Sequence, residues 1–166
     1  MSKYYLIPLT LFLSFIALNS CDHGLAPPSG SETNISGIKG IITYENWPAD
    51  SLYDLRLVIF KSYPPDNIIE DVLYGRAIVY PGLGDPGLPT YIDTTGFLVE
   101  LNSGTYEYVV VAQQYGENLN TDWRAVGEYD TLAGDGLPTA ITVDTGRMLE
   151  EINIHVDFNH LPPQPF

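Results

Sequence analysis

The sequence predicts an all-β fold, a single antiparallel β-sandwich over residues 34–160. Two observations support this prediction. Short apolar runs rich in branched and aromatic residues recur along the stretch, and Gly, Pro and Asp separate them, as strands and turns require. In addition, only residues 66–73 carry a pattern that fits a helical turn. This length is sufficient for one domain with a real core.

The first two predicted strands differ in how they are covered. Residues 38–44 place Ile38, Ile42 and Tyr44 on one face, which predicts a strand with one buried side. Residues 54–60 are apolar on both faces over their second half. A strand with two apolar faces is covered on both sides.

The middle of the domain predicts a hairpin. Residues 97–101 and 106–112 are strand-like, and they flank residues 102–105, where Gly104 suits a tight turn. Residues 80–89 precede them as a long irregular crossover, a kind of loop that is often functional or mobile.

The last strands close the domain. Residues 141–143 form a short strand, and residues 152–158 alternate apolar and polar side chains. This alternation leaves His155 and Asp157 on the solvent side, with His160 just beyond them. Two histidines and an acid would suit a metal, but an exposed polar stripe explains the pattern better.

The N-terminus resembles a bacterial lipoprotein signal peptide that ends in a lipobox. Lys3 is followed by an uncharged apolar run over residues 4–18, and Ser20 precedes Cys21, the only cysteine. The resemblance implies a helical signal segment at residues 1–20, cleavage between Ser20 and Cys21, and acyl lipid on Cys21. An ordinary secretory leader is the alternative.

The lipid anchor implies a bacterial cell-envelope protein, either periplasmic or surface-exposed, that is attached to a membrane. Residues 21–33 comprise the lipidated cysteine and a Gly-, Pro- and Ser-rich segment that we expect to be a disordered tether. Residues 161–166 form a Pro-rich tail.

The charge balance excludes one class of partner. The chain has 21 acidic residues and seven basic ones, and all the acidic ones follow Cys21. A surface this acidic repels phosphate backbones, so we expect no nucleic-acid partner.

Several structural motifs resemble the transthyretin-like (prealbumin-like) sandwiches, a group with carboxypeptidase-regulatory-like and collagen-adhesin B-type modules and an Ig-like architecture. The motifs are Ile35-Ser36-Gly37, Trp47-Pro48, the segment 60–65, Ser103-Gly104-Thr105-Tyr106, Trp123 with Val126-Gly127, and the closing strand. The resemblance implies a seven-stranded sandwich and a binding, spacer or accessory role. It carries over no catalytic residue. No local signature marks Lys39 or Lys61 for the internal isopeptide bond found in collagen-adhesin relatives.

The loop 115–122 clusters oxygen donors at alternate positions. Glu117, Asn118, Asn120 and Asp122 are weak candidates for a calcium site. An EF-hand spacing is missing, and a polar hairpin loop explains the pattern equally well. We therefore expect no metal and no other cofactor.

Loop aromatics are the remaining candidates for a ligand site. Trp47, Tyr115, Trp123 and Tyr129 lie in or beside predicted loops, where such rings stack on sugars or protein partners. The alternative is that they plug the ends of the sandwich.

Three functions remain open. They are a non-catalytic binding or scaffold module for a glycan or protein, a structural accessory subunit of an envelope assembly, and a small envelope hydrolase. No nucleophile motif supports the hydrolase, so we expect no enzyme.

Overall fold

The computed structural model describes residues 35–132 and 136–165. The predicted signal segment 1–20, Cys21 and the tether to residue 33 lie outside these residues. The described part confirms the all-β prediction, with ten strands and one short helix. None of the helical residues in this part forms a segment long and apolar enough to cross a bilayer.

One sheet, which we call sheet A, is built around β1. In it β4 pairs antiparallel with β1, whereas β9 and β10 pair parallel with it. The expectation of a purely antiparallel sandwich is therefore wrong for β1, because period-two alternation is the same in both kinds of pair. The strands are β1 (Gly37–Glu45), β4 (Thr94–Glu100), β9 (Met148–Leu149) and β10 (Ile154–Asp157).

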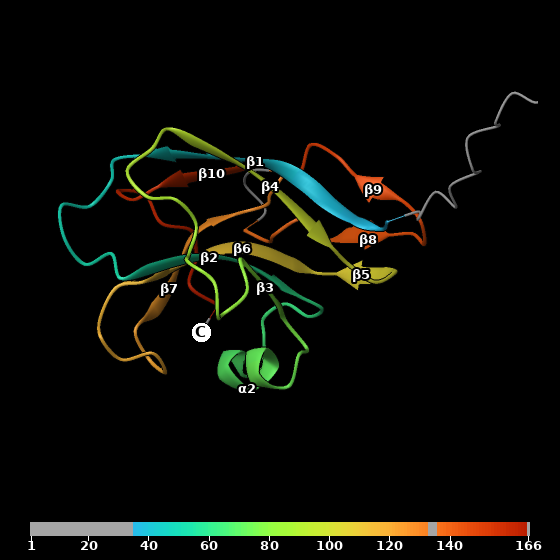
Figure 1. The fold of residues 1–166 in the computed structure, drawn as a ribbon, viewed down its shortest axis with the longest axis horizontal. Helices are drawn as coiled ribbons and strands as arrows, with labels where there is room; N and C mark the ends of the chain where they lie inside the picture. Colours follow the sequence, from blue (N-terminus) through green and yellow to red (C-terminus); the bar gives the residue numbers. More distant parts are fainter. Residues whose placement is uncertain (1–34, 133–135, 166) are drawn as a thin grey trace, which may run out of the picture. The chain divides into compact units, whose positions relative to one another are not determined.

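The second sheet, sheet B, is antiparallel in the order β3-β2-β6-β7. Figure 1 shows sheets A and B as two layers, with helix α2 on the side of sheet B that faces away from sheet A. The strands of sheet B are β2 (Asp54–Phe60), β3 (Ile78–Tyr80), β6 (Tyr108–Gln114) and β7 (Trp123–Glu128).

The predicted hairpin at residues 102–105 is wrong. Here the chain leaves β4 in sheet A, forms β5 (Gly104–Tyr106) paired with β8 (Ile141–Val143), and enters β6 in sheet B. The buried Tyr106 fixes this corner, because its hydroxyl donates to the Asn102 carbonyl at 3.0 Å. A tyrosine that bonds back to upstream backbone is a recognised corner device in sandwiches.

The space between the sheets holds the main core. The inward faces that the sequence predicts for β1 and for residues 152–158 are confirmed: Ile38, Ile42 and Val156 have no exposed surface. From sheet B, Leu57 and Val111 meet them in the same cluster. Burial of these apolar side chains is the dominant stabilising contribution.

Sheet B is also apolar on its outer face, as the sequence of β2 indicates. Val58, Phe60, Tyr108 and Val110 form a second buried cluster there. Helix α2 (Ile68–Leu73) covers part of it, in the only region where the sequence suggested a helical turn. The helix begins where the Asn67 side chain accepts a hydrogen bond from the Glu70 amide at 3.1 Å.

Arg56 holds the long crossover against this outer face. Its side chain, almost wholly buried, pairs with Asp54 at 2.7 Å and donates to the carbonyls of Pro81, Gly82 and Asp85 at 2.8–3.0 Å. Gly87 lies so close to the Asp54 carboxylate that an added Cβ would clash with it. The crossover, which the sequence predicts to be irregular, is thus attached to β2 by several hydrogen bonds.

We expect Arg56→Met to destabilise the protein by about 3 kcal/mol, because Asp54 loses its ion pair and three carbonyls of the crossover each lose a hydrogen bond. Urea unfolding followed by tyrosine and tryptophan fluorescence measures this difference. The control Arg147→Met removes an exposed guanidinium that forms an ion pair with the exposed Asp144 at 3.5 Å. It should change the free energy of unfolding by less than about 0.5 kcal/mol. Equal effects of the two variants would contradict the role given to Arg56.

Candidate functional site

The cover on the outer face of sheet B is incomplete and leaves an apolar groove. Its volume is about 340 Å³, which lies within the range of small-molecule and side-chain pockets. The floor comes from β2, β3 and β6, one wall from α2, and the other from the loop before β7. The lining residues are Asp54, Arg56, Val58, Phe60, Ile68, Ile69, Val72, Leu73, Val79, Leu83, Val110, Ala112, Leu119, Asn120 and Trp123.

Large aliphatic side chains form the rim of this groove. Leu73 on α2, Leu83 on the crossover and Leu119 on the β6–β7 loop have between 62% and 71% of their surface exposed. Scattered exposed leucines are ordinary, but these three converge on one hollow. Convergent apolar side chains around a concave site are typical of a binding surface.

The polar groups at the groove are almost all occupied. Asp54 and Arg56 form an ion pair, and the other N–H groups of Arg56 donate hydrogen bonds to backbone carbonyls. The Trp123 indole N–H donates to the Leu119 carbonyl at 2.9 Å. The groove therefore offers mainly apolar contact, and few free hydrogen-bonding groups, to whatever enters it.

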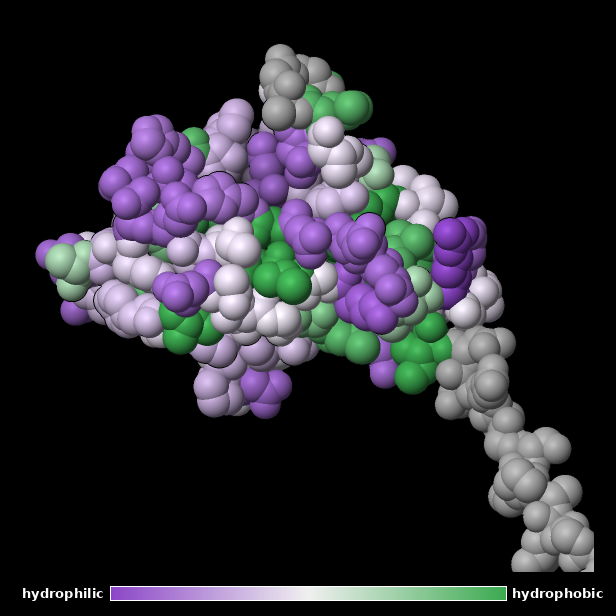
Figure 2. Space-filling model, turned by 90° about the horizontal axis from the view of Figure 1, so that it is seen from above, coloured by the Kyte–Doolittle hydropathy of each residue, from purple (hydrophilic) through white to green (hydrophobic). Residues whose placement is uncertain are grey.

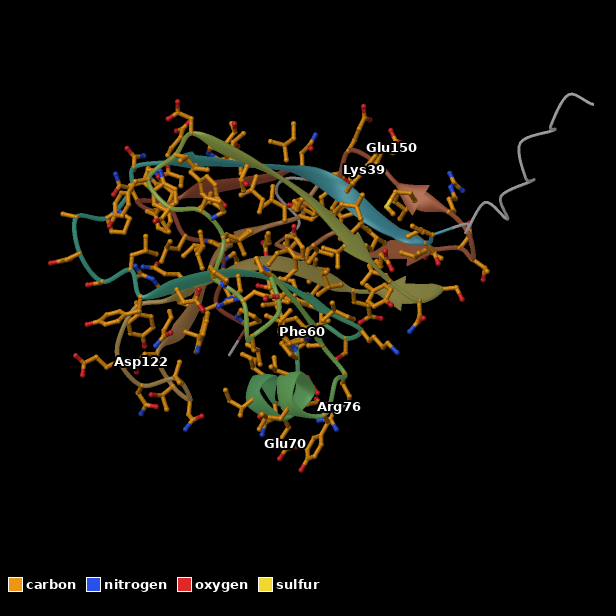
Figure 3. All side chains as sticks on the ribbon, viewed as in Figure 1. Lys39, Phe60, Glu70, Arg76, Asp122 and Glu150 are labelled. Atoms are coloured by element: carbon orange, nitrogen blue, oxygen red, sulfur yellow. The ribbon has the colours of Figure 1, made fainter. Side chains whose placement is uncertain are left out.

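Acidic residues surround the groove. Figure 3 places Glu70 on α2 and Asp122 on the β6–β7 loop, the two elements that form its walls. Glu117 lies on the same loop, and Asp85 lies on the crossover. The two arginines of this region are already paired, Arg56 with Asp54 and Arg76 with Asp71 and Glu70. An incoming cationic group would thus meet a favourable potential.

The oxygen-rich loop uses its side chains to hold its own backbone. Asp122 Oδ2 accepts from the Asn118 amide at 3.0 Å, and Asn118 Oδ1 accepts from the Asn120 amide at 3.0 Å. Glu117 is exposed beside them. In the part of the chain that the structure describes, no three acidic, histidine or cysteine side chains gather as a metal site requires. The alternation of oxygen donors is explained by these turns.

The four predicted ligand aromatics do not form one site. Trp123 lines the groove, whereas Trp47 stacks among Tyr44, Tyr91 and Phe158 at the end of the sandwich. Tyr129 packs against the main core. Tyr115 lies under the Arg124 guanidinium at 5.5 Å. Trp47 thus matches the alternative that loop aromatics close the sandwich.

The histidines near the C-terminus are also separated. His160 contacts the Asp157 carboxylate at 2.7 Å, while His155 contacts the Thr43 hydroxyl at 3.1 Å. Hydrogen bonds from Asn46, from His160 and from the Asn159 amide lower the pKa of Asp157 to about 2. This network joins β10 to the end of β1, so its role is structural.

The partly buried residue Glu128 lies near the outer cluster of sheet B, beside Tyr108. Burial, together with the nearby charge of Asp130, raises the pKa of Glu128 above its usual range. Burial likewise raises the pKa of its neighbour Tyr108. Neither residue is among those that line the groove, and no nucleophile with a positioned base accompanies them in the described residues.

A second hollow, on the outer face of sheet A, is shallow and open. Ile41 and Leu98 are about half exposed there, beside the ion pair of Lys39 with Glu150 at 2.8 Å. Figure 2 shows this side of the protein, with hydrophobic and polar surface interspersed. A mixed and open surface offers less apolar contact than the groove.

Sequence reasoning found Trp123 but missed the rest of the groove. The available signal was β2, whose two apolar faces require a cover on the outer side as well. What the sequence did not reveal is where that cover stops, since this depends on the position of a six-residue helix. Comparison with known proteins finds no match among family models, curated proteins or solved structures.

Proposed function

We propose that this protein is a lipid-anchored module of the bacterial cell envelope that binds a partner protein without catalysing a reaction. In this proposal Cys21 carries the lipid, and the domain is a transthyretin-like sandwich. The binding site is the groove on the outer face of sheet B, which receives apolar side chains of the partner. The observation that carries the proposal is the apolar groove with its exposed leucine rim.

The chemistry of the groove favours a protein segment over a sugar. Sugar recognition needs polar partners for many hydroxyl groups, but Arg56, Asp54 and the Trp123 N–H are already occupied. Burial of one leucine or valine side chain contributes about 1.5–3 kcal/mol, so several of them, with the backbone contacts of a peptide, are needed for micromolar affinity. The acidic surroundings favour a partner segment with basic residues beside its apolar ones.

The apolar groove should bind a neutral hydrophobic dye. We expect Nile red to bind a soluble form that begins at Asn34, since Asn34–Phe166 form a compact unit. Leu119→Asp should weaken binding about tenfold or more, because a charge replaces a buried contact. Fluorescence titration gives the dissociation constant.

The matched control is Leu132→Asp. Leu132 is 66% exposed and Leu119 is 65% exposed, but Leu132 lies away from the groove. The control should bind the dye like the unaltered protein. Circular dichroism checks that both variants fold. Equal weakening by the two substitutions, or by neither, would contradict the assignment of the site.

The lipid anchor is tested at Cys21. We expect an alkyne-tagged fatty acid to label the unaltered protein in growing bacteria, and Cys21→Ala to lose both the label and membrane attachment. Two or three acyl chains bind a bilayer far more firmly than one. An unlabelled native protein, or a Cys21→Ala variant that remains equally membrane-bound, would overturn this part of the proposal.

A further inference from the structure

The outer edge of β7 is covered by a single side chain from the C-terminal tail. The Gln164 carboxamide accepts a hydrogen bond from the Ala125 amide at 2.9 Å and donates one to the Ala125 carbonyl at 3.0 Å. These are the two bonds that a residue of a neighbouring antiparallel strand would exchange with Ala125. A side-chain amide thus stands where a backbone amide would fit.

The tail itself is not a strand. Pro162, Pro163 and Pro165 lack an amide hydrogen, so the tail backbone has little capacity to pair with β7. Gln164 is exposed, and its amide also donates to the Pro162 carbonyl at 2.8 Å. The two bonds to Ala125 are partly buried, and a segment that offers several backbone hydrogen bonds along β7 can replace the two that this one residue makes.

The part of the edge that a displaced tail would free runs from Trp123 to Ala125, and Ala125 has no exposed surface while Gln164 is bonded to it. Residues two apart along a strand direct their amide and carbonyl groups to the same edge, so Trp123 presents a second such pair. At Gly127, beyond Ala125, β10 packs closely on a face of β7, where an added Cβ would lie 2.6 Å from the His155 carbonyl oxygen. The accessible edge is short but continuous with the groove, since Trp123 belongs to both.

We propose that an extended peptide segment of the partner protein pairs with the edge of β7 at Trp123 and Ala125 and displaces Gln164. This inference rests on the proposed function, and it adds how the partner is held. Backbone hydrogen bonds to the edge would supply affinity, and the groove beside Trp123 would select apolar side chains. Successive side chains of the bound segment would point to opposite faces of sheet B, so those between the apolar ones would point away from the groove and can be basic in a protein with a net charge of −14.

The test uses a fluorescein-labelled peptide of seven alternating lysine and valine residues. Fluorescence anisotropy measures its binding to the soluble form that begins at Asn34. We expect Gln164→Ala to tighten binding at least threefold, because the tail no longer competes for Ala125. The same peptide with N-methyl groups on alternate backbone amides keeps its charge and side chains but loses donors, and it should bind at least tenfold more weakly.

The control for the tail is Asn159→Ala, which removes an exposed amide outside the paired segment. It should bind the peptide like the unaltered protein. Nile red affinity should be the same in Gln164→Ala, so that failure at the edge is distinguishable from failure of the groove. Equal binding of the methylated peptide, or no gain in Gln164→Ala, would overturn the strand proposal. A Gln164→Ala protein that dimerises and ignores the peptide would assign the edge to a second copy and also overturn it.

Discussion

The structure depends on one constraint, which is that sheet B is apolar on both faces. All seven residues of β6 are buried, and six of the seven in β2 are. Sheet A covers one face completely, and the inner core is accordingly continuous. Among the described residues, the other face is covered by a six-residue helix, a crossover, a loop and the side chain of Tyr63. Arg56 stabilises this cover, because its buried guanidinium joins the Asp54 carboxylate to three carbonyls of the crossover. The groove is the part of the face that these elements do not reach.

The groove and the edge of β7 form one surface with two kinds of contact. Trp123 belongs to both. The backbone amide and carbonyl of Ala125, which now bond to the Gln164 side chain, would bond to the incoming strand. Apolar burial gives affinity with little directional preference, whereas backbone pairing fixes the direction and register of a bound strand. A surface that combines them suits an extended protein segment better than a sugar or a catalytic substrate. A lipid on Cys21 would hold this binding surface close to the membrane, where an envelope partner would be found.

The sequence predicted the features that depend on neighbours along the chain. The buried faces of β1 and of residues 152–158 follow from alternation, the two buried faces of β2 follow from its apolar run, and helix α2 lies within the predicted segment 66–73. Features that depend on distant residues were missed. Alternation does not distinguish the parallel pair of β1 and β10 from an antiparallel one, and the Tyr106 corner resembles a hairpin turn locally. Likewise, Arg56 finds its carbonyl partners 25 to 29 residues away, and Gln164 finds Ala125 across 39 residues. Trp123 was found because an aromatic residue beside a loop is informative, but its neighbours in the groove come from four other segments.

The central claim is that the outer face of sheet B contains an accessible apolar site while the inner core is closed. Methyl NMR spectra of the form beginning at Asn34, recorded during titration with octanol, test it directly. The account predicts saturable shifts for the methyl groups of Val58, Val79 and Val110, which line the groove. Val111 and Val156 in the inner core should not shift. Shifts confined to the inner core, or to Ile41 and Leu98 on sheet A, would contradict it, as would a spectrum that octanol leaves unchanged.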